Sequence, residues 1–246
     1  MKGGQSLFYR FGADLVLPRW FRGLPIRATG LEHVPRKGAC VLIANHRSVY
    51  DPLVMVEAIR RPINFIAADF LFKIPGVGWA LRNAGVTPIR IDGGQRSRHS
   101  LDIAVDILEQ KQPVGIFPEG ATQFATPDPR GVGEFRTGFA RIACAARCPV
   151  VPMAVVPQRE RTLAKFPGWL ARQFTGSSRF TEGAVLLGYE GSVELVIGAP
   201  LDFRAHYRKP ETGDLLHAMA RQAQAEVKRL YGIGKRKLKS GKGARG

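Results

Sequence analysis

The amino-acid sequence predicts an α/β fold: a single mixed, largely parallel sheet flanked by helices, with an amphipathic segment before it and a basic tail after it. Val- and Ile-rich runs of strand length alternate along the chain with helical stretches, a pattern typical of parallel strands that helices cover on both faces. Hydrophobic residues make up 45% of the 246 positions and charged residues 23%, which are ordinary values for a globular protein. The body of the chain is therefore expected to fold as one domain.

Each expected element follows from a local pattern. Short apolar runs bounded by turn residues indicate strands, and apolar positions three or four apart indicate helices. The strands are expected at 39–45, 63–68, 113–120 (ending in a glycine turn), 149–156, 184–189 and 192–201, and the helices at 52–61, 101–111, 135–147 and 211–232. Asp51 is expected to cap the first of these helices, with Pro52 at its first position. Sites in such sheets gather at the carboxyl ends of strands, so the segments after the first and third strands are the candidates.

Composition divides the chain into three parts. In residues 1–25, Phe8, Phe11 and Leu15 fall at helical spacing among arginines, as in a short helix lying flat on a membrane. A helix packed on the core of the domain itself is the alternative. Residues 26–232 are expected to form the main domain. Residues 233–246 are expected to form a basic, flexible tail.

The net charge of +17 at pH 7 indicates polyanionic partners: nucleic acid, an anionic membrane surface or phosphorylated substrates. Apolar and cationic side chains also interleave between 158 and 180, a pattern that suits stacking on single-stranded nucleic acid or a lipid interface. They are Phe166, Trp169, Leu170 and Phe174, with Arg161, Lys165, Arg172 and Arg179. No helix-turn-helix, ribonucleoprotein or zinc-finger signature accompanies the charge, so nucleic acid is not the expected partner.

Two other features bear on location and metal binding. No run approaches the ~18 apolar residues of a membrane-spanning helix, and the N-terminus lacks the clean apolar centre of a signal peptide. The protein is therefore expected to remain in the cytoplasm. Cys40, Cys144 and Cys148 show no CxxC spacing, so they are expected to be reduced thiols and not metal ligands.

The stretch VLIANHRSVYDP places His46 directly after a buried strand and Asp51 at the start of the next helix. A separation of five is wrong for one face of a helix, but the two side chains can meet across a tight strand-to-helix turn. Asp51 would then accept a hydrogen bond from one imidazole nitrogen and leave the other as a base. Ser48 lies in the turn without a GxSxG elbow, which disfavours a serine hydrolase. The alternative is that Asp51 only caps the helix and that His46 is structural.

Four blocks, in the right order, resemble the motifs of the glycerophospholipid acyltransferases, in particular the 1-acyl-glycerol-3-phosphate acyltransferases. The first, NHxSxxD, is matched by Asn45, His46, Ser48 and Asp51. The second, a glycine followed by an extended run to an arginine, is similar to GVTPIR, which ends at Arg90. The third, FPEG, is matched by Phe117, Pro118, Glu119 and Gly120, and the fourth, an apolar run around a proline, by VVPMAV with Pro152. The resemblance covers roughly residues 26–201, most of the main domain.

The resemblance implies transfer of a fatty acyl group from an acyl-CoA or acyl-carrier-protein thioester to the free hydroxyl of a lysophosphatidic acid, giving phosphatidic acid. No metal or other cofactor is implied. His46 would be the general base and Asp51 its orienting partner. Substrate contacts would come from Asn45, Arg47, Ser48, Arg90, Phe117, Pro118, Glu119 and Gly120, with Arg90 on the phosphate of the acceptor. Donor, acceptor and inner leaflet are all anionic, so the basic protein would act peripherally at the cytoplasmic face of the cell membrane.

One departure concerns the third motif. It usually continues as Thr-Arg-Ser after the glycine, but here Ala121, Thr122 and Gln123 follow. The missing arginine would contact the acceptor phosphate, and Arg130 or Arg136 is a possible substitute. The acceptor therefore stays open between lysophosphatidic acid and another lysophospholipid, a glycolipid or a lyso-aminolipid. A basic nucleic-acid-binding protein is a remote alternative that leaves the ordered motifs unexplained.

Overall fold

The structure, a computed structural model, describes residues 24–48, 50–68, 72, 86–89, 95–120, 130–175 and 183–240. Several sequence predictions fall outside these ranges. They are the amphipathic helix expected before residue 24, Gly85 and Arg90 of the second motif, and the segment 121–123 that follows the third motif.

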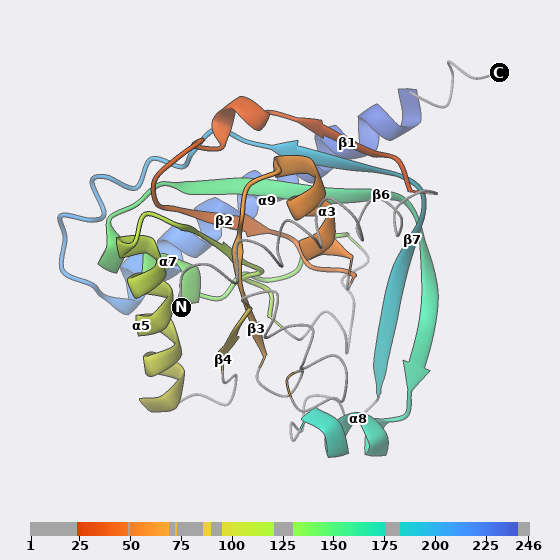
Figure 1. Cartoon of the computed structure of the whole chain (residues 1–246), viewed down its shortest axis with the longest axis horizontal. Helices are drawn as coiled ribbons and strands as arrows, with labels where there is room; N and C mark the ends of the chain where they lie inside the picture. The colour runs from red at the N-terminus through yellow and green to blue at the C-terminus, as the bar shows by residue number, and fades with distance from the viewer. Residues whose placement is uncertain are drawn as a thin grey trace.

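A seven-stranded sheet, counted over the described residues, forms the centre of the molecule (Figure 1). Its strand order is β1-β7-β6-β2-β5-β3-β4. The strands are β1 (Ile26–Thr29), β2 (Cys40–Ala44), β3 (Asn64–Ala68), β4 (Thr87–Ile89), β5 (Pro113–Ile116), β6 (Val150–Phe166) and β7 (Ala184–Ile197). Every neighbouring pair is parallel except β6 with β7. The predicted mixed, largely parallel sheet is confirmed.

Helices cover both faces of this sheet, which explains why its central strand is an unbroken apolar run. On β2, Val41 and Ile43 face a cluster that includes side chains of α5 (Gln95–Glu109), α7 (Gly138–Ala146) and α9 (Gly213–Ser240). The intervening residues Leu42 and Ala44 face the opposite cluster, which includes α3 (Asp51–Ile59). The remaining helical elements are the short η2 (Leu31–His33) and α8 (Gly168–Thr175). Among the described helices, none is long and apolar enough to cross a bilayer.

The two antiparallel strands, β6 and β7, are longer than the sequence predicts. β6 was expected to end near residue 156 but continues to Phe166, and the two late strands expected at 184–189 and 192–201 are one strand, β7. They pair with each other from Met153 opposite Ile197 out to Phe166 opposite Ala184. Their outer halves, 159–166 and 184–190, leave the sheet with α8 at the tip (Figure 1). We call this hairpin the arm.

The last helix also differs from the prediction. It was expected to end at Gly232, with a flexible tail from residue 233, but α9 continues to Ser240. Its buried stripe continues past the glycine through Gly234 and Leu238. A Cβ on Gly234 would lie 2.6 Å from Cγ2 of Val156 on β6. The glycine therefore lets the helix approach the sheet closely and does not end it.

Candidate active site

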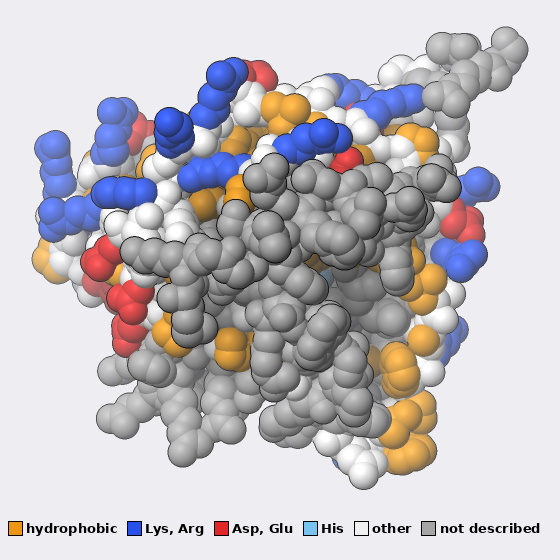
Figure 2. Space-filling model, viewed as in Figure 1, with side chains coloured by type: hydrophobic (Ala, Val, Ile, Leu, Met, Phe, Trp, Pro, Cys, Tyr) orange, Lys and Arg blue, Asp and Glu red, His pale blue; other side chains and the backbone are white. Residues whose placement is uncertain are grey.

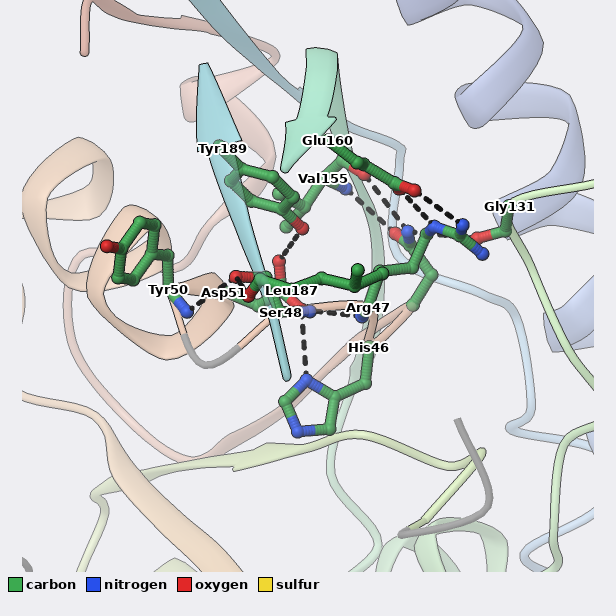
Figure 3. Close-up of polar contacts among 11 residues, drawn as sticks. His46, Arg47, Ser48, Tyr50, Asp51, Gly131, Val155, Glu160, Leu187 and Tyr189 are labelled. Atoms are coloured by element: carbon green, nitrogen blue, oxygen red, sulfur yellow. Dashed lines mark hydrogen bonds and ion pairs between the residues drawn. The ribbon is translucent and has the colours of Figure 1, made fainter. Parts of the chain in front are cut away.

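The turn between β2 and α3 brings together the polar residues of the first motif (Figure 3). Asp51 is the first residue of α3 and is fully buried. Its Oδ2 accepts hydrogen bonds from Nδ1 of His46 at 2.9 Å and from the backbone N–H groups of Arg47 at 2.7 Å and Ser48 at 2.8 Å. The hydroxyl of Tyr189 donates to its Oδ1. The Asp51 side chain therefore points back into the turn and does not cap the helix, so the expected capping role is wrong.

His46 is held in one orientation by this carboxylate. Because an ionised carboxylate only accepts, Nδ1 of His46 carries the proton and Nε2 offers a lone pair. The side chain is 15% exposed, and in Figure 3 the second ring nitrogen points away from Asp51. Phe117 stacks on the imidazole with the ring centroids 4.1 Å apart, and Phe65 stacks on Phe117 at 5.8 Å. The pair expected from the sequence does meet, in the geometry of an oriented base.

Arg47 is buried and bound to a residue of the arm. Its guanidinium bonds both carboxylate oxygens of Glu160, once through Nε and once from Nη2 to Oε2 at 2.8 Å. Burial lowers the pKa of the Arg47 guanidinium, but the hydrogen bonds and the negative charge of Glu160 outweigh this effect. The pKa of Arg47 is therefore raised above its usual value. A substrate phosphate would have to compete with Glu160 for this cation. The ion pair fixes the turn to β6, and the substrate contact expected of Arg47 stays a prediction.

Asn45 and Ser48, for which the resemblance implies substrate contacts, also form hydrogen bonds to the protein backbone. Both amide hydrogens of Asn45 donate to carbonyls, of Gly131 at 3.2 Å and Val155 at 3.0 Å, and its oxygen accepts the N–H of Val155 at 2.8 Å. The hydroxyl of Ser48 donates to the carbonyl of Leu187 at 2.6 Å. Both side chains are fully buried. They hold the turn against β6, β7 and the loop at residue 131.

The third motif reaches the same sheet edge, because β5 lies parallel to β2 and both strands end there. Its backbone turns sharply: the N–H of Gly120 donates to the carbonyl of Phe117 at 3.1 Å, and Gly120 has φ +66°. Pro118 is buried, and its carbonyl accepts the N–H of Arg136 at 3.0 Å. A Cβ on Gly120 would lie 3.5 Å from Nε of Arg136. Arg136 therefore lies against this turn, whereas Arg130 is exposed on the surface.

Glu119 of the third motif is buried, with 1% of its surface exposed. Burial raises the pKa of its carboxyl to about 8, and the negative charge of Asp51 adds to the rise. The backbone N–H groups of Gly133 and His46 and the Arg47 guanidinium oppose it. At neutral pH the group is therefore mostly a neutral carboxylic acid.

Sequence reasoning missed Tyr189 and Glu160. They lie 138 and 113 residues from the side chains they bond, Asp51 and Arg47. No local spacing in the sequence predicts these two contacts, because they form only where β6 and β7 extend past the end of β2. The one available signal was a tyrosine closing a predicted strand, which is more often a packing residue.

The fold and the site together define a class: an α/β protein with a hydrogen-bonded histidine–aspartate pair at the carboxyl end of a central parallel strand. A family model described as Acyltransferase matches residues 25–156, more than half of the chain. The chain belongs to this family, and the resemblance to the glycerophospholipid acyltransferases is confirmed.

Individual relatives agree with this assignment. A 1-acyl-sn-glycerol-3-phosphate acyltransferase of Borreliella burgdorferi is 26% identical over 148 residues, 60% of this chain and 58% of that protein. An uncharacterized protein of Mycobacterium tuberculosis is 29% identical over 152 residues, 57% of this chain and 39% of that one. The match thus spans less than two thirds of either relative. The crystal structure of the 1-acyl-sn-glycerophosphate acyltransferase PlsC from Thermotoga maritima shares the fold, with a TM-score of 0.55 and 21% identity over 97% of this chain and 79% of that one.

Proposed function

We propose that this protein is an O-acyltransferase that moves a fatty acyl group from a thioester to the free hydroxyl of a lysophosphatidic acid, giving phosphatidic acid. The observation that carries the proposal is the bond of 2.9 Å between Nδ1 of His46 and buried Asp51, which leaves Nε2 as a base. Family membership and the name of the Borreliella burgdorferi relative support the choice of reaction.

The proposed step needs only this base and the two substrates. As the acceptor oxygen forms its bond to the thioester carbon, its proton moves to Nε2 of His46. Asp51 stabilises the imidazolium that results. The carbon–sulfur bond then breaks, and the departing thiolate takes the proton from Nε2, which returns His46 to its neutral form. No covalent enzyme intermediate and no cofactor enter this sequence.

The phosphate of the acceptor needs a cation near the third motif. Arg136 supports this role because it lies against the turn at Gly120, where a guanidinium can bond two phosphate oxygens at once. Arg130 is exposed and is the weaker candidate. Arg90 stays a prediction from the second motif. A different lysophospholipid, a glycolipid or a lyso-aminolipid is the alternative acceptor, motivated by the missing arginine of the third motif.

The donor and the place of action belong to the same proposal. Both acyl-CoA and acyl-carrier protein are anionic thioester donors, and the net charge of +17 suits either. The same charge suits an anionic membrane, and we place the protein peripherally on the cytoplasmic face of the cell membrane, where a lysolipid acceptor would be found.

An acyl-transfer assay tests this function. Purified protein would be given a labelled acyl group, as acyl-CoA or as acyl-carrier-protein thioester in separate reactions, and a panel of acceptors: lysophosphatidic acid, a zwitterionic lysophospholipid and a phosphate-free lysolipid. We expect diacylated product with lysophosphatidic acid, and Arg136→Gln should raise the apparent KM of that acceptor while Arg130→Gln, the matched control, leaves it near the parent value. Preference for the phosphate-free lysolipid would favour the alternative acceptor. Absence of product with every acceptor and with both donor types would refute the proposal.

A further inference from the structure

The arm carries an exposed apolar surface at its tip. Four large hydrophobic side chains are exposed among the described residues, and three of them are on the arm: Leu163 at 37%, Phe166 at 40% and Trp169 at 63%. Figure 2 shows hydrophobic side chains gathered at the lower right, where Figure 1 has the arm and α8. Leu163 lies over Gly188 of the paired strand, beside an irregularity in the register between Thr162 and Ala164. An exposed aromatic surface of this kind on a folded domain is typical of a contact site.

Cations surround this tip, while the acids of the arm are already paired. Lys165 and Arg172 are exposed beside Phe166 and Trp169. Of the two described acids on the arm, Glu160 binds Arg47 and Glu190 lies 3.5 Å from Arg161. A tip with exposed aromatics next to exposed cations complements a surface that is apolar inside and anionic at its edge.

We propose that the tip of the arm, Leu163, Phe166 and Trp169 with Lys165 and Arg172, is a docking surface for an anionic lipid bilayer. The inference rests on the proposed function for one step only: a lysolipid acceptor is presented by such a bilayer. The arm is also the element that holds the catalytic turn, through Glu160, Leu187 and Tyr189. A bilayer bound at the tip therefore lies against the same element that positions His46.

Vesicle binding by the full chain tests the tip directly. The probe is phosphatidylcholine vesicles containing about one third phosphatidylglycerol, with no acyl donor or acceptor present. The double variant Phe166→Ala/Trp169→Ala should bind at least about ten-fold more weakly, since it removes two aromatic rings from the contact. Leu31→Ala is the matched control: Leu31 is 42% exposed on η2, away from the arm, and its removal should leave binding unchanged. Circular dichroism verifies that each variant is folded.

The outcomes separate this inference from the proposed reaction, because binding is measured without catalysis. Unchanged vesicle affinity in the double variant, or an equal loss in Leu31→Ala, would overturn the docking surface. Loss of binding to an acidic acyl-carrier protein with vesicle binding intact would assign the tip to the donor and would also overturn it.

A second inference rests on an independent contact, the bond from Tyr189 to Asp51. Tyr189 is 7% exposed, and its hydroxyl donates to Oδ1 while His46 uses Oδ2. Burial, together with the charge of Asp51 and the hydrogen bond to it, raises the pKa of the phenol well above its usual value. The hydroxyl therefore stays a donor at any physiological pH. We infer that Tyr189 is a positioning residue, which fixes the Asp51 carboxylate so that Oδ2 remains on the imidazole.

Replacing this hydroxyl tests the role, on the premise that His46 is the base. Tyr189→Phe should lower kcat about ten-fold, the typical effect of one lost bond to a charged group, with both substrate KM values nearly unchanged. Without the hydrogen bond from the Tyr189 hydroxyl, the Asp51 carboxylate keeps more of its negative charge. That charge stabilises the protonated ring of His46. The acid limb of the kcat profile should then move to higher pH.

Tyr207→Phe is the matched control, because it removes the hydroxyl of another tyrosine, a partly buried one that donates to the carbonyl of Cys148 at 2.7 Å. Both variants should lose some thermal stability, but the control should keep the parent kcat and pH profile. If Tyr189→Phe lowers only the melting temperature, its role is structural and the inference fails. An inactive parent protein would instead refute the proposed reaction.

Discussion

At the scale of single residues, the site depends on how one carboxylate is shared. The Asp51 carboxylate accepts hydrogen bonds from the ring of His46, from two backbone N–H groups of its own turn and from the phenol of Tyr189. Hydrogen-bonded to this extent, the buried carboxylate has one favourable orientation. The carboxylate in turn fixes the orientation of the His46 ring, so the base that we propose is preorganised before any substrate arrives.

The first prediction concerns this pair. His46→Ala should lower the acyl-transfer rate ~100-fold to 10,000-fold, the usual cost of losing a general base. Asp51→Asn should also lower it strongly, since the neutral amide no longer stabilises the imidazolium. Steady-state kinetics on variants whose folding is verified by circular dichroism would measure both. A His46→Ala protein that keeps more than about a tenth of the parent rate would show that His46 is not the base.

The second prediction concerns the buried carboxyl group of Glu119. Because the pKa of Glu119 is raised from 4.5 to about 8, the folded protein binds a proton that the unfolded chain releases between these values. This contribution to stability is complete below pH ~4.5 and is lost as the pH rises through ~8. Between pH 5 and 8 the parent should lose ~3 kcal/mol relative to Glu119→Gln, whose amide does not titrate.

Denaturant unfolding of the two proteins across this pH range would measure the effect. The free energy of unfolding of Glu119→Gln should fall less than that of the parent as the pH rises. Parallel pH dependences would contradict the protonated state of Glu119, whatever the absolute stabilities.

At the scale of elements, the sequence predicted what is local and missed what depends on partners. The strand ending at Ala44, the turn, and the meeting of His46 with Asp51 could be predicted, because a buried apolar run and a five-residue spacing determine them. The outer half of β6 could not, since its residues from 159 onward are mostly polar and exposed and its order comes from pairing with β7. The protein partners of Asn45 and Arg47 could not be predicted for the same reason, because they lie on β6 and in a distant loop.

The third prediction tests two glycines of α9: Gly232, where the helix was expected to end, and Gly234. Gly234→Ala should destabilise the protein by ~1 to 3 kcal/mol, since its Cβ would lie 2.6 Å from a methyl of buried Val156, which cannot rotate away cheaply. Gly232→Ala is the matched control. Its Cβ would meet nothing closer than the guanidinium of Arg236 at 3.7 Å, so it should stabilise the helix by ~0.5 to 1 kcal/mol.

Chemical denaturation of the two variants would compare them directly. Opposite signs are expected. If both substitutions stabilise the protein, α9 does not pack on β6 at Gly234. If Gly232→Ala destabilises it, the expected helix end at Gly232 would be the better description.

At the scale of the whole molecule, the excess of positive charge acts over longer distances than any single contact. The chain carries 37 Lys and Arg against 20 Asp and Glu. Exposed cations near an anionic bilayer each contribute roughly 1 kcal/mol, and salt screens that attraction over ~8 Å at physiological ionic strength. The apolar contact proposed for the arm is not screened in this way. Membrane binding should therefore have two components that salt separates.

The fourth prediction uses that separation. Affinity for vesicles containing about one third phosphatidylglycerol should fall at least about ten-fold between low and high salt, and affinity for pure phosphatidylcholine vesicles should change little. Phe166→Ala/Trp169→Ala should keep the steep salt dependence, because its charges are intact, while the binding that survives at high salt disappears. Lys165→Gln/Arg172→Gln should do the reverse and flatten the dependence. Cosedimentation over a salt series would measure all three proteins, and a parent affinity that does not respond to salt would mean that the net charge serves the soluble substrates and not the membrane.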